Sequence, residues 1–114
     1  MAASSATKYL HRARDLNDAF RRSFSAGRVV LTAGIAAVPE PCRTALLAAV
    51  RGFECFDADN DPHGEHDFGE VQVGKARCLW KIDAYDRALT VASPDPTDSA
   101  VTVRVLTVML AEEY

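Results

Sequence analysis

The chain has 114 residues, 48% of them hydrophobic and 25% charged, with a formal net charge of −3 at pH 7. This composition is typical of one globular domain over residues 1–114, with residues 1–6 as a frayed lead-in, and argues against a disordered chain. Its three cysteines form no Cys-x-x-Cys pair, and no apolar run approaches bilayer length, which disfavours a zinc ribbon, a redox pair and a membrane protein. Because the N-terminus also lacks the apolar run of a signal peptide, we expect a cytoplasmic protein.

The first half of the chain predicts two helices and one strand. Residues 7–24 place apolar side chains at steps of three and four, and Gly27 follows them as a stop signal. Residues 28–32 are short, apolar and rich in β-branched side chains, which indicates a buried strand, and a connection follows. A second helix begins near Pro41, because the fixed φ of proline suits the first turn.

The second half predicts a β-hairpin and a third helix. Residues 68–73 alternate apolar and polar side chains, and the pattern resumes at residues 76–83 after a turn at Gly74. Residues 85–91 are compatible with a further short strand, and the apolar stripe of residues 99–114 indicates a helix. The chain order therefore predicts an α+β fold, a small antiparallel sheet with three helices packed on one face.

Charge is distributed unevenly along the chain. Residues 1–30 contain six basic and two acidic side chains, a net charge of +4. Residues 52–70 contain seven acidic side chains and no lysine or arginine, a net charge of −7. We call residues 57–70 the acidic loop. It contains two histidines, His63 and His66, and six carboxylates: Asp57, Asp59, Asp61, Glu65, Asp67 and Glu70. Solvent, basic side chains or a bound cation must balance this charge, so the acidic loop is the first candidate for a functional site.

A calcium site of the EF-hand type does not fit the acidic loop. Asp57, Asp59 and Asp61 match the alternating ligands at the start of an EF-hand loop. The sixth position, however, is Pro62 where the sharp turn requires glycine, and the twelfth is Phe68 where a bidentate glutamate is required.

Two interpretations of the acidic loop stay open. His63, His66 and Asp67, with Asp61 or Glu65, are ligand types that a divalent transition metal accepts, although their spacing matches no diagnostic motif. The alternative is structural, because Asp, Asn, Pro and Gly in this order favour turns in which side chains bond nearby backbone amides. In that case the carboxylates fix the shape of the loop.

Catalysis and nucleic-acid binding receive less support from the sequence. No motif identifies a nucleophile, and Cys78 falls on the apolar face of a strand, so no catalytic residue is assigned. The basic side chains of the first helix are interrupted by Asp15 and Asp18, and no DNA-binding motif accompanies them.

Two segments of the chain are distinctive: residues 60–69 (Asn-Asp-Pro-His-Gly-Glu-His-Asp-Phe-Gly) and residues 80–86 (Trp-Lys-Ile-Asp-Ala-Tyr-Asp). Together with residues 16–20, 28–34, 93–96 and 106–114, they resemble a bacterial domain-of-unknown-function family, numbered 3768. The family pattern has Tyr-Tyr-Asp where this chain has Ala84-Tyr85-Asp86, so a paired-tyrosine surface is incomplete here. The resemblance implies a prokaryotic, cytoplasmic, stand-alone domain found on chromosomes and plasmids, and it implies no activity.

These observations lead to an expected function. We expect a small non-enzymatic module that binds an unidentified protein partner through Asp57, Asp59, Asp61, Glu65 and Tyr85, with no cofactor, nucleic acid or membrane. Because members of the family that this chain resembles are found on plasmids, we expect its biological role to be that of a mobile-element-borne regulator or inhibitor of a host system. The alternative is a metal-binding domain or metal-dependent enzyme with a site at residues 61–67.

Overall fold

The computed structural model describes residues 5–114. Of the predicted lead-in, residues 1–4 lie outside the described residues, whereas Ser5 already belongs to the first helix. The helices are α1 (Ser5–Ser23), α2 (Ala33–Ala37), α3 (Glu40–Arg51) and the 3-10 turn η1 (Ala111–Glu113). The strands are β1 (Arg28–Leu31), β2 (Phe68–Val73), β3 (Ala76–Tyr85) and β4 (Val103–Leu110).

The four strands form one mixed sheet in the order β1-β4-β3-β2. The β2–β3 and β3–β4 pairs are antiparallel, and β1 runs parallel to β4. The predicted α+β class is confirmed. The sheet is mostly antiparallel, as expected, but the short edge strand β1 makes it mixed.

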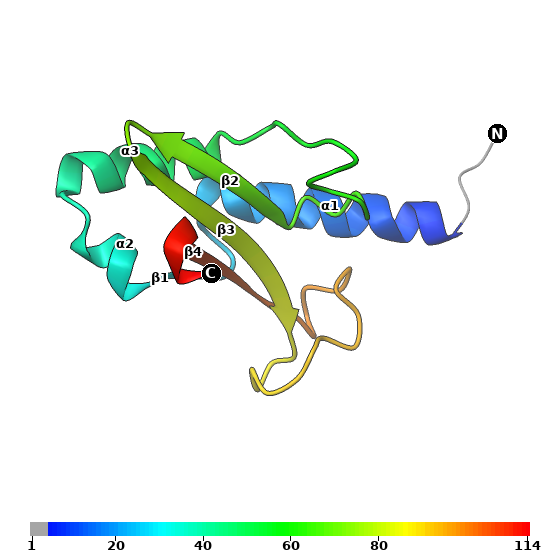
Figure 1. The fold of residues 1–114 in the computed structure, drawn as a ribbon. Coiled ribbons are helices and arrows are strands. Elements are labelled where there is room, and N and C mark those ends of the chain that lie inside the picture. Colours follow the sequence, from blue (N-terminus) through cyan, green and yellow to red (C-terminus); the bar gives the residue numbers. More distant parts are fainter. Residues whose placement is uncertain (1–4) are drawn as a thin grey trace.

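Helices α1 and α3 pack on one face of the sheet and enclose the core (Figure 1). Trp80, Leu106 and Val108 point into this core from the two central strands and are fully buried. Phe20 of α1 and Leu46 of α3 close it from the helical side, with 2% and 0% of their surface exposed. On the opposite face of the sheet, Tyr114, which follows η1, packs edge-on against Phe68 of β2, and Met109 of β4 is buried.

The β2–β3 hairpin has the predicted two-residue turn. Val73 pairs with Ala76 across Gly74 and Lys75. Gly74 has φ +59, the left-handed conformation that the first position of a type II′ turn requires, and glycine adopts it without a steric cost. A second glycine, Gly69, allows close packing, because a Cβ there would lie 2.6 Å from the indole nitrogen of Trp80.

Three local predictions were wrong. The segment predicted as a C-terminal helix, residues 99–114, contains strand β4 and the turn η1. The predicted strand at residues 85–91 is a loop after β3, with one isolated bridge between Tyr85 and Ala92. The predicted connection after β1 contains the short helix α2, whose Ile35 is fully buried in the core.

The C-terminal turn η1 is attached through Glu113 to the segment that follows the neighbouring strand β1. Its carboxylate accepts hydrogen bonds from the Thr32 hydroxyl (2.6 Å), the Gly34 amide (3.1 Å) and the Leu110 amide (2.8 Å). These donors lower the pKa of Glu113, the Thr32 hydroxyl most strongly. One side chain therefore links β4, β1 and the start of α2.

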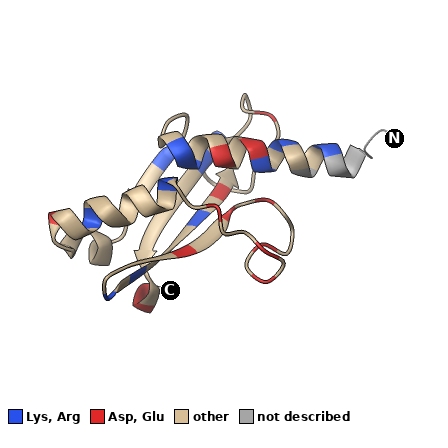
Figure 2. Cartoon of the chain, turned by 90° about the horizontal axis from the view of Figure 1, so that it is seen from above, with Lys and Arg blue, Asp and Glu red and all other residues tan. Residues whose placement is uncertain are grey.

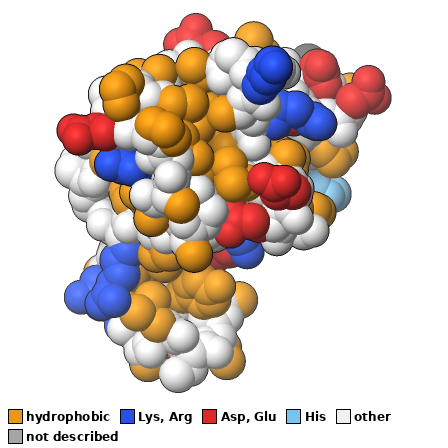
Figure 3. Space-filling view, turned by 60° about the vertical axis from the view of Figure 1, so that its left-hand side comes forward, with side chains coloured by type: hydrophobic (Ala, Val, Ile, Leu, Met, Phe, Trp, Pro, Cys, Tyr) orange, Lys and Arg blue, Asp and Glu red, His pale blue; other side chains and the backbone are white. Residues whose placement is uncertain are grey.

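Residues 86–102 form a lobe that projects beyond the end of the sheet, at the bottom of Figure 3. The Asp86 carboxylate accepts a hydrogen bond from the Thr90 amide (2.9 Å), and Leu89 adopts a left-handed φ of +60. This turn presents Leu89 and Val91 to solvent, with 36% and 61% of their surface exposed. Arg12 of α1 donates to the Thr97 carbonyl (2.9 Å) and ties the lobe to the helical layer.

Candidate functional site

The acidic loop follows α3 and residues 52–56, continues into the first residues of β2, and lies beside α1 (Figures 1 and 2). Its first turn is built by its own polar side chains. The Asp57 carboxylate accepts hydrogen bonds from the amides of Asp59 (2.9 Å) and Asn60 (3.0 Å). Asn60 in turn accepts from the Asp57 amide (2.9 Å) and donates to the Cys55 carbonyl (2.7 Å). This is the turn chemistry that the Asp and Asn spacing predicted.

The second turn is organised by Asp61 and His66. The Asp61 carboxylate accepts a hydrogen bond from the His66 amide (3.1 Å), and only 6% of the Asp61 side chain is exposed. His66 has φ +53, a left-handed conformation that histidine adopts more readily than most residues. Its ring stacks on Phe56, with centroids 3.7 Å apart and planes within 3° of parallel. Asp61 and His66 therefore face the inside of the loop.

The His66 ring lies between two carboxylates. Its Nδ1 is 3.0 Å from Oδ1 of Asp18 on α1, and its Nε2 is 3.6 Å from Oδ2 of Asp61. Asp18 also accepts a hydrogen bond from Arg21 (2.9 Å), a side chain with no exposed surface. The His66 ring and the side chains of Asp18, Asp61 and Arg21 thus form one largely buried network between α1 and the acidic loop.

Two further contacts attach the loop region to α1. Arg21 donates to the Phe53 carbonyl (2.9 Å), and its guanidinium lies over the rings of Phe56 (5.3 Å) and Trp80 (5.1 Å). Asn17 donates to the Glu65 carbonyl (2.9 Å) and accepts from buried Arg104 of β4 (2.8 Å). The roles of Asn17, Asp18 and Arg21 were not predicted from the sequence. The sequence shows that these three residues share one face of the helix, but it does not show that the acidic loop covers that face.

The carboxylates at the end of the loop repel one another. Partial burial raises the pKa of Asp67, and the negative charges of Asp61 and Asp83 raise it further. Burial likewise raises the pKa of Glu65, with contributions from Asp67 and Asp61. His63 is exposed and opposes both shifts. Both carboxyl groups therefore lose their protons less readily than in the unfolded chain.

The predicted partner-binding residues do not form one surface. Asp57 and Asp59 are exposed, Glu65 is half-buried, and Asp61 points inward. Tyr85 lies at the far end of β3, opposite Val103 of β4, and is not part of the hydrogen-bond network of the loop.

The predicted metal ligands are also dispersed. His66 is engaged by Asp18 and Asp61, whereas His63 is exposed. Within residues 5–114, no three His, Cys, Asp or Glu side chains are grouped so that they could hold one metal ion. The geometry therefore gives the metal interpretation no support.

A cysteine nucleophile at Cys78 is disfavoured by its surroundings. Cys78 is fully buried on the core face of β3, and burial raises the pKa of its thiol to about 11. The thiol is therefore protonated at neutral pH and is a core side chain.

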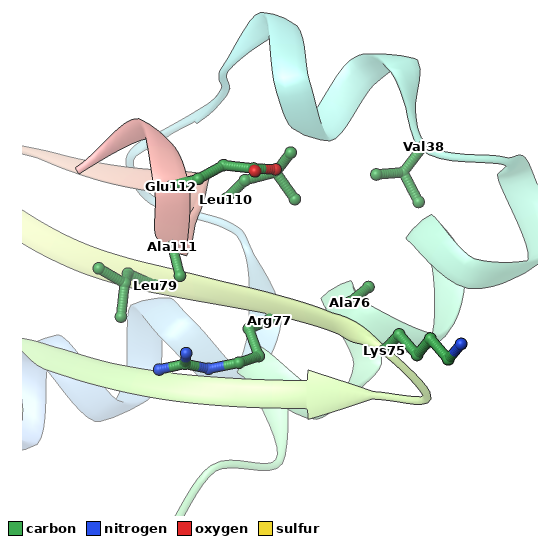
Figure 4. A pocket seen from close by; sticks show the side chains of 8 residues that line it. All are labelled: Val38, Lys75, Ala76, Arg77, Leu79, Leu110, Ala111 and Glu112. Atoms are coloured by element: carbon green, nitrogen blue, oxygen red, sulfur yellow. The ribbon is translucent and has the colours of Figure 1, made fainter.

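A pocket of about 640 Å³ lies at the opposite end of the hairpin from the acidic loop (Figure 4). It is bounded by the hairpin turn, β4, η1 and the end of α2, and it is lined by Val38, Lys75, Ala76, Arg77, Leu79, Leu110, Ala111 and Glu112. None of the predicted site residues lines it. Nothing in the sequence indicates this pocket, because its lining comes from separated segments of ordinary composition.

Comparisons with known proteins place the chain in a family. No curated protein and no solved structure matches it significantly. Within residues 5–114, no helix combines the length and apolar character needed to cross a membrane. A family model described as "Protein of unknown function (DUF3768)" matches residues 31–113, which contain α2, α3, the acidic loop, β2, β3, β4 and η1. Because this match covers most of the chain and agrees with the resemblance noted in the sequence, the chain belongs to the DUF3768 family.

Proposed function

We propose that this protein is a small, non-enzymatic interaction module that binds a basic surface of a partner protein through the acidic loop. The proposal is supported by the way the polar side chains of the loop are divided between its inner and outer sides. Asp61 and His66 point inward and fix the loop to α1, while Asp57 and Asp59 are exposed on its outer side.

An ordered acidic loop is suited to recognition. Binding costs free energy when a flexible segment must be ordered, and the hydrogen bonds of Asp57 and Asn60 order this turn before any partner arrives. The net charge of −7 over residues 52–70 would steer a basic partner toward the loop and reject an acidic one. A prokaryotic cytoplasmic setting, and a role as a mobile-element-borne regulator or inhibitor of a host system, are part of this proposal.

The test is a charge reversal that spares the loop's own hydrogen bonds. Asp59→Lys changes one exposed side chain of the loop, whereas Asp57 is left intact because its carboxylate holds the turn. The matched control is Glu112→Lys, an exposed carboxylate in η1. The three proteins are tagged, recovered from the cells that naturally produce the protein, and compared by quantitative mass spectrometry.

We expect at least one protein with a basic surface to be recovered with the parent and the control, and to be reduced about tenfold or more with the loop variant. The same protein should dissociate as ionic strength rises, because the contact is electrostatic. Identical recovery with the parent and the loop variant would exclude the acidic loop as the binding surface.

A further inference from the structure

Strand β4 is apolar on both faces, and the face away from α1 and α3 is covered only toward the end of β4, where Met109 is buried and Tyr114 packs against Phe68 of β2. Leu106 and Val108 point into the core, while Val103, Val105 and Thr107 point to the opposite face. On that opposite face Val30 of β1 has 45% of its surface exposed and Leu79 of β3 is half-buried. A strand with one solvated face normally alternates apolar and polar residues, whereas continuous apolar runs are typical of strands covered on both sides.

We propose that this open face of the sheet binds a second copy of the chain, with β4 packed on β4 around a two-fold axis that runs along the strand. The proposal concerns a surface other than the acidic loop and does not depend on the proposed function. Its occupant is inferred from the arrangement of charge across the sheet.

The strand register places opposite charges at equal distances on either side of β4. Arg28 of β1 pairs in register with Val105 of β4, and Val105 pairs with Asp83 of β3, so the three residues form one row across the open face. A two-fold rotation about β4 exchanges the β1 and β3 sides. It therefore places Arg28 of each copy over Asp83 of the other, and Val105 against its own equivalent.

The charges in this row are available for such a contact. Arg28 is exposed and has no ion-pair partner among residues 5–114. Among the described residues, Asp83 forms an ion pair only with Lys81 of the same strand, at 3.1 Å, and 38% of its side chain is exposed. In the next row, Val30 would lie over the aliphatic stem of Lys81 of the second copy.

The size of the open face sets the expected strength of the contact. With strands about 4.8 Å apart and a rise of about 3.3 Å per residue, strands of 4, 6, 10 and 8 residues present a face of about 440 Å². Side-chain relief adds to this projected area, but the contact stays below the roughly 800 Å² per partner of a standard interface, so we expect a weak dimer that forms at high protein concentration.

The test measures the oligomeric state of the full chain by sedimentation equilibrium over a range of concentrations. We expect the parent to dimerise, and Val105→Lys to abolish the dimer because it buries two unpaired charges on the axis. The control is Val91→Lys, an exposed apolar position in the lobe that lies outside the row, and it should dimerise like the parent.

A charge exchange tests the geometry with surface substitutions that spare the core. Arg28→Asp and Asp83→Arg should each raise the dimer dissociation constant about tenfold or more, because each places like charges together. The double variant should return the constant to within about threefold of the parent value. A parent that stays monomeric into the millimolar range, or a dimer indifferent to Val105→Lys and to both single reversals, would overturn the proposal. Asp59→Lys in the acidic loop should leave the dimer unchanged, which separates this result from the test of partner binding.

Discussion

At the scale of single residues, the surroundings of the Asp67 side chain disfavour its ionised form. Partial burial and the nearby carboxylates of Asp61 and Asp83 raise its pKa. At neutral pH the ionised side chain therefore lowers the stability of the folded state. When the pH falls, the folded state takes up this proton before the unfolded state does, so the destabilising contribution disappears.

Asp67→Asn tests this pH dependence. We expect the variant to be more stable than the parent at pH 7 to 8, since the amide cannot ionise, and the difference should shrink as the pH falls toward 4. Urea denaturation at a series of pH values measures it. The control is Asp59→Asn, because the exposed Asp59 carboxylate accepts no hydrogen bond from a described residue. A constant difference between Asp67→Asn and the parent over the whole pH range would contradict the assignment.

At the scale of secondary structure, the contact between α1 and the acidic loop depends on Asp18. This carboxylate receives both Arg21 and His66, so replacing it leaves a buried guanidinium without its counter-ion. We expect Asp18→Asn to lower the free energy of unfolding by about 3 kcal/mol. Hydrogen exchange should show faster exchange at residues 57–66, where the tether is lost.

The matched control for Asp18→Asn lies one turn earlier on the same helix. Asp15 pairs with Arg14 at 3.2 Å, and 68% of its side chain is exposed, so Asp15→Asn should cost less than about 1 kcal/mol. If the two variants lose the same free energy of unfolding, the contacts of Asp18 with Arg21 and His66 contribute no more to stability than an exposed ion pair.

The elements that could be predicted are those whose patterns are local. The hairpin turn at Gly74, the first helix and the Asp57 turn are specified by neighbouring residues, and all three are present. Strand β4 was predicted as a helix because its apolar residues fall on both faces, which hides the period of two. The core position of Ile35 in α2 and the pairing of Asp18 with His66 depend on contacts far apart in the sequence, which periodicity does not report.

At the scale of the whole molecule, the family match begins at residue 31, whereas the folded domain also includes helix α1 and strand β1, which begin before that residue. Helix α1 contributes Phe20 to the core, and Asn17 joins the Glu65 carbonyl to Arg104 of β4. Loss of a buried phenylalanine alone costs about 3–5 kcal/mol, a large part of the roughly 5–15 kcal/mol that stabilises a typical domain.

We therefore expect a fragment of residues 31–113 to be unfolded. It should give neither a cooperative thermal transition by circular dichroism nor dispersed amide signals by NMR, whereas the full chain should give both under the same conditions. A cooperative transition in the fragment would mean that the sheet and α3 close a core without α1.

The position of Trp80 gives the molecule an intrinsic optical reporter. It is the only tryptophan in the chain, it is fully buried, and it contacts the groups that join α1 to the acidic loop. Phe53 and Phe56 meet its ring edge-on at 5.5 and 6.1 Å, and the Arg21 guanidinium lies 5.1 Å from it. Its emission wavelength should therefore move to the red whenever α1 separates from the loop, so the docking of these two segments can be followed in the unlabelled protein.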